Sequence, residues 1–122
     1  MGKILIIEDD PFLLKLYKEI LSDTGLEVEE ALDGETGLRK VKDSKPDLIL
    51  LDIMLPKMNG LDVLEKLKEG QSTREIPVVI ITNLASEEDK KRAMDLGAIS
   101  YMIKTEYEPD QVVALVKEII KR

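Results

Sequence analysis

Carboxylates follow two apolar runs of the sequence, at positions where a strand would end. Glu8 and Asp9 follow the run Ile4–Ile7, and Asp52 follows the run Leu48–Leu51. Carboxylates brought close together raise each other's pKa unless a cation neutralises them. A site of oxygen ligands with few protein groups suits Mg²⁺, especially when a phosphate completes the coordination shell. These acids therefore predict a magnesium site.

Two more polar residues end later apolar runs. Thr82 follows Val78–Ile81, and Lys104 follows Ser100–Ile103. A hydroxyl donor and an ammonium group both suit the oxygens of a phosphoryl group in transfer. Carboxylates accept phosphoryl groups as aspartyl phosphates, and a metal ion orients the donor and offsets its charge. The pattern therefore predicts phosphoryl transfer to Asp52, with Thr82 and Lys104 contacting the phosphoryl oxygens.

The segments that must position these residues form five predicted strand–helix units. Apolar runs without polar alternation are typical of strands covered on both faces, and apolar residues at helical spacing follow them. Asp10–Pro11, Ser86 and Pro109 are helix-start signals. The predicted strands are Lys3–Ile7, Glu27–Ala31, Leu48–Leu51, Val78–Ile81 and Ser100–Ile103, and the predicted helices are Pro11–Leu21, Gly34–Val41, Asn59–Lys68, Ser86 to about Gly97, and the segment from Pro109.

Alternating strands and helices with right-handed crossovers predict an α/β fold: a single doubly wound, five-stranded parallel sheet, (βα)5, with helices on both faces. By analogy with known sheets of this kind, the expected strand order is 2-1-3-4-5. Ligands of such sheets bind beyond the carboxyl ends of the strands, where the order reverses. The predicted site residues should therefore meet beyond the ends of the first and third strands.

Length and composition limit the possible functions. With 122 residues and 43% hydrophobic content, the chain is expected to form one domain over residues 1–122. The absence of His and Cys excludes imidazole and thiol nucleophiles, disulfides and the zinc sites built from them. The net charge of -7 argues against direct nucleic-acid binding. No signal peptide or membrane-spanning run occurs, so a cytoplasmic protein is expected.

The chain resembles a response-regulator receiver domain of two-component signalling, with a flavodoxin-like fold, over essentially its whole length. Ile4–Asp10 resembles the first strand and acid pair of that family, and Asp52–Gly60 resembles its phosphoacceptor loop. The resemblance implies that Asp52 is the phosphoacceptor and that Lys104 is the family's invariant lysine. It also implies that Mg²⁺ binds Glu8, Asp9, Asp52 and the backbone carbonyl of Met54, and that Thr82 and Tyr101 are switch residues.

The sequence departs from the family pattern at a few positions near the site. Thr105 follows Lys104 where the family usually has a proline in a cis peptide, which leaves the isomer of this bond open. Asn83 occupies a position that is usually small, and is expected to crowd the pocket. Met54 and Leu84 occupy positions that often influence dephosphorylation, and as apolar side chains they are expected to lengthen the phosphorylated lifetime.

Partners follow from the same resemblance. Because the chain has no histidine, the phosphoryl group must come from a histidine kinase or a histidine phosphotransfer protein, expected to dock on Pro11–Leu21 and the loop after the fifth strand. Phosphorylation is expected to repack the face made by the fourth helix, fifth strand and fifth helix, where a downstream protein target binds. The chain ends after the fifth helix, so no effector domain is expected. We expect a monomer that dimerises on phosphorylation, and no enzyme activity beyond its own phosphorylation and dephosphorylation.

Other interpretations compete with this one. Taken singly, Glu8 and Asp9 are also explained as helix-start acids, Thr82 as a turn hydroxyl and Lys104 as a solvated lysine. A nucleotidase is disfavoured because no G-x-x-x-x-G-K-[ST] loop occurs, and flavin binding because the first loop is acidic. The main alternative is a phosphorylation-independent interaction module, which would keep the fold but gain nothing from Mg²⁺.

Overall fold

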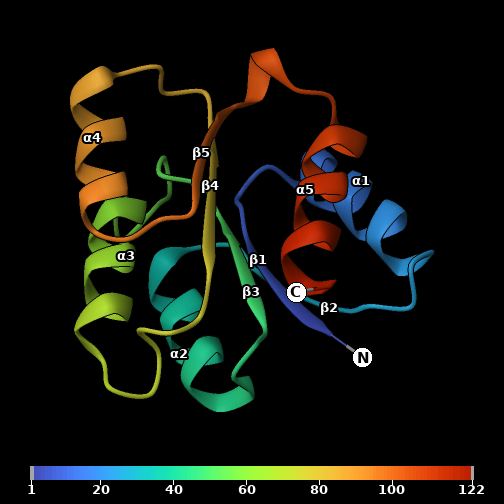
Figure 1. Ribbon diagram of the computed structural model, residues 1–122, viewed down its shortest axis with the longest axis horizontal. Coiled ribbons are helices and arrows are strands. Elements are labelled where there is room, and N and C mark those ends of the chain that lie inside the picture. Colours follow the sequence, from blue (N-terminus) through green and yellow to red (C-terminus); the bar gives the residue numbers. More distant parts are fainter. Residues whose placement is uncertain (1, 122) are drawn as a thin grey trace.

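Strands and helices alternate along the chain in a computed structural model that describes residues 2–121 (Figure 1). Met1 and Arg122, the two ends of the expected 1–122 domain, lie outside the described residues. None of the helices within residues 2–121 combines the length and the apolar character needed to cross a membrane. The strands are β1 (Lys3–Ile7), β2 (Glu27–Ala31), β3 (Leu48–Leu51), β4 (Val78–Thr82) and β5 (Ser100–Ile103), and the helices are α1 (Pro11–Ser22), α2 (Gly34–Ser44), α3 (Gly60–Glu69), α4 (Glu87–Asp95), η1 (Lys104–Glu106) and α5 (Pro109–Lys121).

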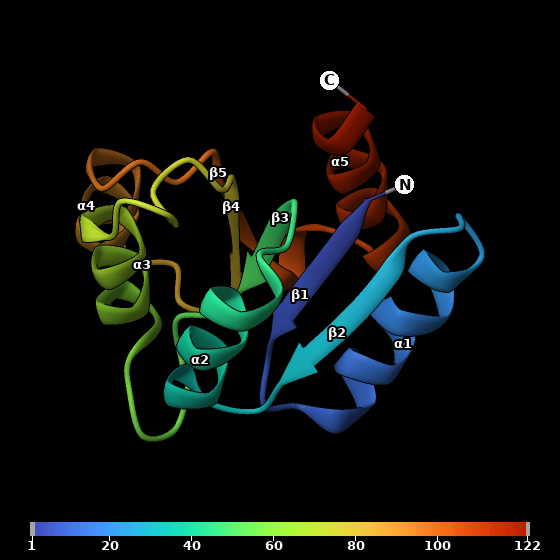
Figure 2. The ribbon, with the colours of Figure 1, turned by 90° about the horizontal axis from the view of Figure 1, so that it is seen from below.

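The strands form one parallel sheet in the order β2-β1-β3-β4-β5, which confirms the predicted topology. In Figure 2 the arrowheads of β1 and β2 point the same way. The register pairs Ile7 with Leu51, and the Asp52 amide donates to the Ile7 carbonyl at 3.0 Å. Because β1 and β3 are neighbours that end at the same level, the residues that follow them meet beyond the sheet.

Two apolar layers hold the helices on the sheet. Side chains of alternate strand residues point to opposite faces, so Leu5 and Ile49 pack under α2 and α3 while Ile6 and Leu50 pack under α1 and α5. Figure 1 shows α2, α3 and α4 on one side of the sheet and α1 and α5 on the other. Each fully buried aliphatic side chain contributes roughly 1.5–3 kcal/mol. Strands that are apolar on both faces thereby fix the sheet as a rigid central layer.

Helix starts follow the sequence signals. The Asp10 carboxylate accepts a hydrogen bond from the Phe12 amide at 3.0 Å before Pro11, and the Ser86 hydroxyl accepts one from the Asp89 amide at 3.2 Å. Asn59, predicted as the first helical residue, instead caps α3 by accepting from the Leu61 amide at 2.7 Å. The short helix η1 was not predicted from the sequence, because three residues carry too little periodicity to identify it.

Candidate functional site

The structure brings together the three acids predicted from the sequence. Glu8 lies directly beyond β1 and Asp52 directly beyond β3, with relative exposures of 1% and 3%, whereas Asp9 is exposed. One carboxylate oxygen from each lies within 4.8 Å of the others. We call Glu8, Asp9 and Asp52 the acid cluster. Two of its carboxylates are out of contact with water, so a nearby cation must offset their charge.

Lys104 supplies that positive charge. Its Nζ donates to Asp52 Oδ2 at 2.8 Å and lies 2.8 Å from Glu8 Oε1. Glu8 Oε1 is buried and has no hydrogen bond of regular geometry in the described chain. Lys104 begins η1, directly after β5, and none of the peptide bonds within residues 2–121 is cis. The Lys104–Thr105 bond is therefore trans, and Lys104 still reaches Asp52.

Burial and pairing have opposite effects on the charged groups of the site. Burial raises the pKa of Glu8 above its ordinary value, although the Lys104 ammonium and the Asp10 amide, which donates to Glu8 Oε2 at 3.1 Å, lower it. Burial by itself lowers the pKa of Lys104, but its hydrogen bond to Asp52 and its close pairing with the Glu8 carboxylate outweigh this and raise it. Lys104 therefore stays charged at neutral pH.

The phosphoacceptor-loop candidate, residues 52–60, joins β3 to α3, and we call it the acceptor loop. The Met54 amide donates to Asp52 Oδ1 at 3.0 Å, so the Met54 backbone lies beside the predicted acceptor. A Cβ on Gly60 would lie 2.2 Å from the Asp52 carbonyl oxygen, which makes glycine necessary there. The Met54 side chain is 56% exposed and Asn83 is exposed as well, and the expectation that Asn83 crowds the site stays a prediction.

The two predicted switch residues bond to the backbone of the same residue, Leu84. Thr82 is fully buried at the end of β4, and its hydroxyl accepts a hydrogen bond from the Leu84 amide at 3.2 Å. The Tyr101 hydroxyl donates to the Leu84 carbonyl at 2.7 Å. Burial raises the pKa of Tyr101, with smaller effects from Asp89 and Asp52. The Tyr101 side chain is thus already turned inward, and Leu84 connects it to Thr82.

Sequence reasoning missed the part played by the Leu84 backbone. Leu84 was noted only for its apolar side chain, whereas the amide and carbonyl of this residue bond to both switch candidates. No sequence signal exists for a backbone group of this kind.

Tyr17, at an apolar position of α1, is buried, and burial together with Glu8 and Asp52 raises its pKa.

The residues of the acid cluster fit a hard divalent cation. All the donors are oxygens, two of the carboxylates are buried, and the third is open to solvent. Glu8 Oε1 is buried and has no hydrogen-bond partner among the described residues, although Lys104 Nζ lies 2.8 Å from it, so it keeps acceptor capacity that a cation could use. Mg²⁺ prefers this donor set and keeps several waters, which the exposed side of the site allows.

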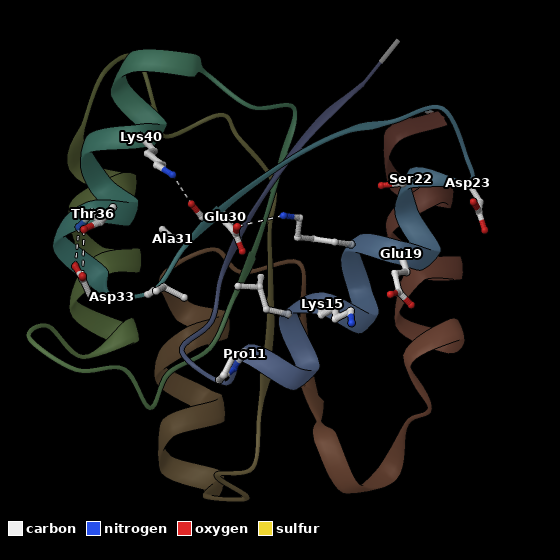
Figure 3. Close-up of a pocket in the computed structure, with 13 residues that line it drawn as sticks. Pro11, Lys15, Glu19, Ser22, Asp23, Glu30, Ala31, Asp33, Thr36 and Lys40 are labelled. Atoms are coloured by element: carbon white, nitrogen blue, oxygen red, sulfur yellow. Dashed lines mark hydrogen bonds and ion pairs between the residues drawn. The ribbon is translucent and has the colours of Figure 1, made fainter.

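A groove of about 930 Å³ lies away from the acid cluster, between α1, β2 and α2 (Figure 3). Lys18 Nζ donates to the Glu30 side chain at 3.1 Å, and Lys40 Nζ donates to the Glu30 carbonyl. The two lysines thus cover the free edge of β2 from either side, a common protection of an edge strand against pairing. The side chains that line the groove carry charges of both signs, and two of its carboxylates are paired with lysines, Glu30 with Lys18 and Asp33 with Lys57.

Comparison with known proteins assigns the fold and the site to a class. The family model of the response regulator receiver domain matches residues 4–117. The chain therefore belongs to the response regulator receiver domain family of two-component signalling.

Individual relatives agree with this assignment. The chain is 37% identical over 122 residues to the DNA-binding dual master transcriptional regulator RpaA of Synechocystis sp., and 40% identical over 122 residues to the transcriptional regulatory protein CpxR of Escherichia coli. Each match covers 100% of the chain but only 50% of the relative, so the chain spans about half the length of these regulators.

Solved structures show the same fold. A CheY-like receiver domain protein from Methanospirillum hungatei superposes with a TM-score of 0.91 at 32% identity, covering 99% of the chain and 94% of that structure. The BeF3-activated N-terminal receiver domain of Klebsiella pneumoniae RstA gives a TM-score of 0.88 at 29% identity, covering 99% of the chain and 100% of that structure.

Proposed function

We propose that the protein accepts a phosphoryl group onto Asp52 in a Mg²⁺-dependent reaction and so switches a protein-binding surface. The arrangement that supports this most strongly is a buried Asp52 that shares the Lys104 ammonium with Glu8 at 2.8 Å. If Lys104 served only to form a structural ion pair, one carboxylate would be enough to balance its charge. A second buried carboxylate and a third beside it leave an excess of negative charge that a divalent cation offsets.

In the proposed reaction a carboxylate oxygen of Asp52 attacks the phosphorus of a phosphohistidine on the donor. The O–P bond forms while the P–N bond breaks, and the imidazole nitrogen keeps the electron pair of the broken bond. The acid cluster and the Met54 carbonyl would hold Mg²⁺, which would neutralise charge and orient the phosphoryl group. Lys104 and the Thr82 hydroxyl contact the phosphoryl oxygens, where charge accumulates in the transition state. The protein catalyses only its own phosphorylation and dephosphorylation.

The phosphodonor is a histidine kinase or a histidine phosphotransfer protein, because the chain itself has no histidine. We place its docking surface on α1 and the loop after β5, next to Asp52. Phe12, in the first turn of α1, is 77% exposed, and Thr105 and Glu106 are exposed as well. An exposed aromatic side chain beside the site provides apolar contact area for a donor helix.

The output is a shift between two packings of the β4–α4 region. The Thr82 hydroxyl accepts from the Leu84 amide and would donate to a phosphate on Asp52, so its movement toward the phosphate would shift its bond to Leu84, whose carbonyl also holds Tyr101. The face formed by α4, β5 and α5 then binds a downstream protein or a second copy of the chain. RpaA is named as a DNA-binding regulator but is about twice as long as this chain, and we propose no direct nucleic-acid contact for this domain.

Metal removal tests the proposal. Incubated with a small-molecule phosphodonor and Mg²⁺, the protein is expected to gain the mass of one phosphoryl group, because the metal offsets the charge of the acid cluster. Chelation of the metal should lower the extent of labelling to background in the same intact-mass measurement. Equal labelling with and without Mg²⁺ would contradict the proposal, and no labelling in either sample would favour the phosphorylation-independent interaction module.

Replacing Thr82 tests the switch. Thr82→Ala is expected to accept phosphate at Asp52 but to lose the phosphate-dependent change on α4 and β5, because the hydroxyl that would contact the phosphate is gone. Amide chemical shifts of α4, β5 and α5, recorded with and without phosphorylation, measure this change. Thr82→Ser, which keeps the hydroxyl, is the matched control and should retain it. A full response in Thr82→Ala would show that the signal bypasses Thr82.

A further inference from the structure

The turn between β2 and α2 presses against the acceptor loop. Gly34, the first residue of α2, is buried, and a Cβ built on it would lie 2.7 Å from the Met58 carbonyl oxygen and 2.9 Å from Met58 Cβ. Real Cβ atoms do not approach other atoms this closely, and the Met58 carbonyl is backbone that cannot rotate away. The absence of a side chain at position 34 therefore determines how closely the acceptor loop approaches α2.

Asp33, the preceding residue, fixes the same turn from the other side. Its carboxylate accepts hydrogen bonds from the Thr36 amide at 2.8 Å and the Thr36 hydroxyl at 3.1 Å, as Figure 3 shows. Asp33 Oδ2 also lies 3.8 Å from Lys57 Nζ in the acceptor loop. The Thr36 amide, with smaller contributions from Lys57, lowers the pKa of Asp33, so its charge persists below neutral pH.

The acceptor loop needs such support because its own backbone is irregular. Lys57 has a φ of 69°, a left-handed conformation that is unfavourable for a residue with a side chain. Within the loop the Leu55 amide bonds to the Ile53 carbonyl, and the Met58 amide bonds to the Pro56 carbonyl at 2.7 Å. These bonds span two residues each and fix the local shape of the loop. Its two ends are anchored by the bonds from the Asp52 amide to the Ile7 carbonyl and from the Gly60 amide to the Ile53 carbonyl, which leaves the middle of the loop, around Met58, to contacts with α2.

We propose that Asp33 and Gly34 are positioning residues for the magnesium site, acting through Met58 and Lys57 on the acceptor loop. The loop carries the Met54 backbone, whose amide holds Asp52 Oδ1 at 3.0 Å. Displacement of the Met58 backbone would move the Met54 backbone relative to the Asp52 carboxylate. The two would then no longer be placed correctly as ligands of Mg²⁺. This inference rests on the proposed function, since Met54 and Asp52 matter here as ligands of Mg²⁺.

Substitution of Gly34 tests the inference without any phosphodonor. Gly34→Ala is expected to weaken Mg²⁺ binding about tenfold, the scale typical of groups that orient metal ligands. Titration with Mg²⁺ alone, followed by the Asp52 and Met54 amide signals, gives the dissociation constant. Phosphorylation of the same variant should return toward the wild-type rate at saturating Mg²⁺, because the variant affects metal affinity and leaves the reacting groups in place.

Gly37→Ala is the matched control. Gly37 lies one turn further along α2, and the three atoms nearest to its added Cβ all belong to the side chain of Ile7 rather than to the acceptor loop. It should perturb the packing of α2 while leaving Mg²⁺ affinity within about twofold of wild type, whereas loss of a group that orients metal ligands costs about tenfold or more. An equal loss in Gly37→Ala, or wild-type affinity in a folded Gly34→Ala, would overturn the inference.

Asp33→Asn keeps the inference falsifiable if Gly34→Ala does not fold. Asparagine also caps helices, so this variant removes the ion pair with Lys57 and retains the bond to the Thr36 amide. A reduction of Mg²⁺ affinity of about twofold or more is expected, by the same outer-shell effect. Unchanged affinity would remove Asp33 from the proposal. Failure of the wild-type protein itself to bind Mg²⁺ would instead overturn the proposed function.

Discussion

Asp52→Asn is expected to abolish phosphorylation completely while leaving the protein folded. The amide that replaces the carboxylate is not nucleophilic, so the bond to phosphorus cannot form. The intact mass after incubation with Mg²⁺ and a small-molecule phosphodonor should equal that of the untreated variant. Asp9→Asn is the matched control: it removes an exposed member of the acid cluster, and should lower the rate through weaker metal binding without removing the acceptor.

The effect of Asp52→Asn on stability has a definite sign. Glu8 and Asp52 together carry two negative charges against the one positive charge of Lys104. Neutralising Asp52 leaves Lys104 paired with Glu8 alone, so no buried charge loses its partner. The free energy of unfolding in metal-free buffer is therefore expected to stay within about 1 kcal/mol of wild type, or to rise. Persistent labelling of a folded Asp52→Asn protein would show that another residue accepts the phosphoryl group.

Lys104→Met is expected to have the largest effect on stability. Methionine fills much of the space of the lysine stem, but Glu8 and Asp52 are left buried without a counterion. Removal of one partner from a buried ion pair typically costs about 3–5 kcal/mol. Urea unfolding in metal-free buffer at neutral pH should show a loss of this size. The variant should also accept phosphate far more slowly, since the ammonium no longer contacts the phosphoryl oxygens.

The pH dependence of this loss is predicted by the environment of Glu8. Burial already raises the pKa of Glu8, and removal of the ammonium raises it further. A carboxyl group with a folded-state pKa above the unfolded value gives stability that is present at low pH and lost as the pH rises through the folded-state pKa. The loss in free energy of unfolding of Lys104→Met should therefore be largest at neutral pH. It should shrink as the pH is lowered toward 4.5, the ordinary pKa of glutamate.

Magnesium provides a second test of the same variant. In the wild-type protein Mg²⁺ must compete with Lys104 for the carboxylates, because the ammonium lies 2.8 Å from both. Mg²⁺ should therefore bind the folded Lys104→Met variant more tightly than folded wild type. A given Mg²⁺ concentration should then raise the free energy of unfolding of the variant more than that of wild type. Lys104→Arg, which keeps a positive charge, should show most of the wild-type stability. A folded Lys104→Met with unchanged stability and unchanged pH dependence would mean that the carboxylates do not depend on this ammonium.

The sequence by itself determined the order of the elements, the parallel sheet and the edge at which the site lies. Apolar runs such as Leu48–Leu51 predict strands because a strand that is buried on both faces has no alternation of polar and apolar residues. The residues that end these runs, Glu8, Asp52, Thr82 and Lys104, were then placed by topology alone, because parallel strands bring their carboxyl ends to one edge. The resemblance to receiver domains supplied their expected roles and the parts assigned to Met54 and Tyr101.

Only the tertiary structure decided which of these groups touch. Lys104 pairs with both Glu8 and Asp52, Tyr101 bonds to the Leu84 carbonyl, and Gly34 meets the acceptor loop. Periodicity records which face of an element is buried, but it carries no distance between residues that are far apart along the chain. The pairing of Lys104, the inward turn of Tyr101 and the fit of Gly34 depend on tenths of an ångström between separate elements, and those distances exist only once the sheet and its helices are packed.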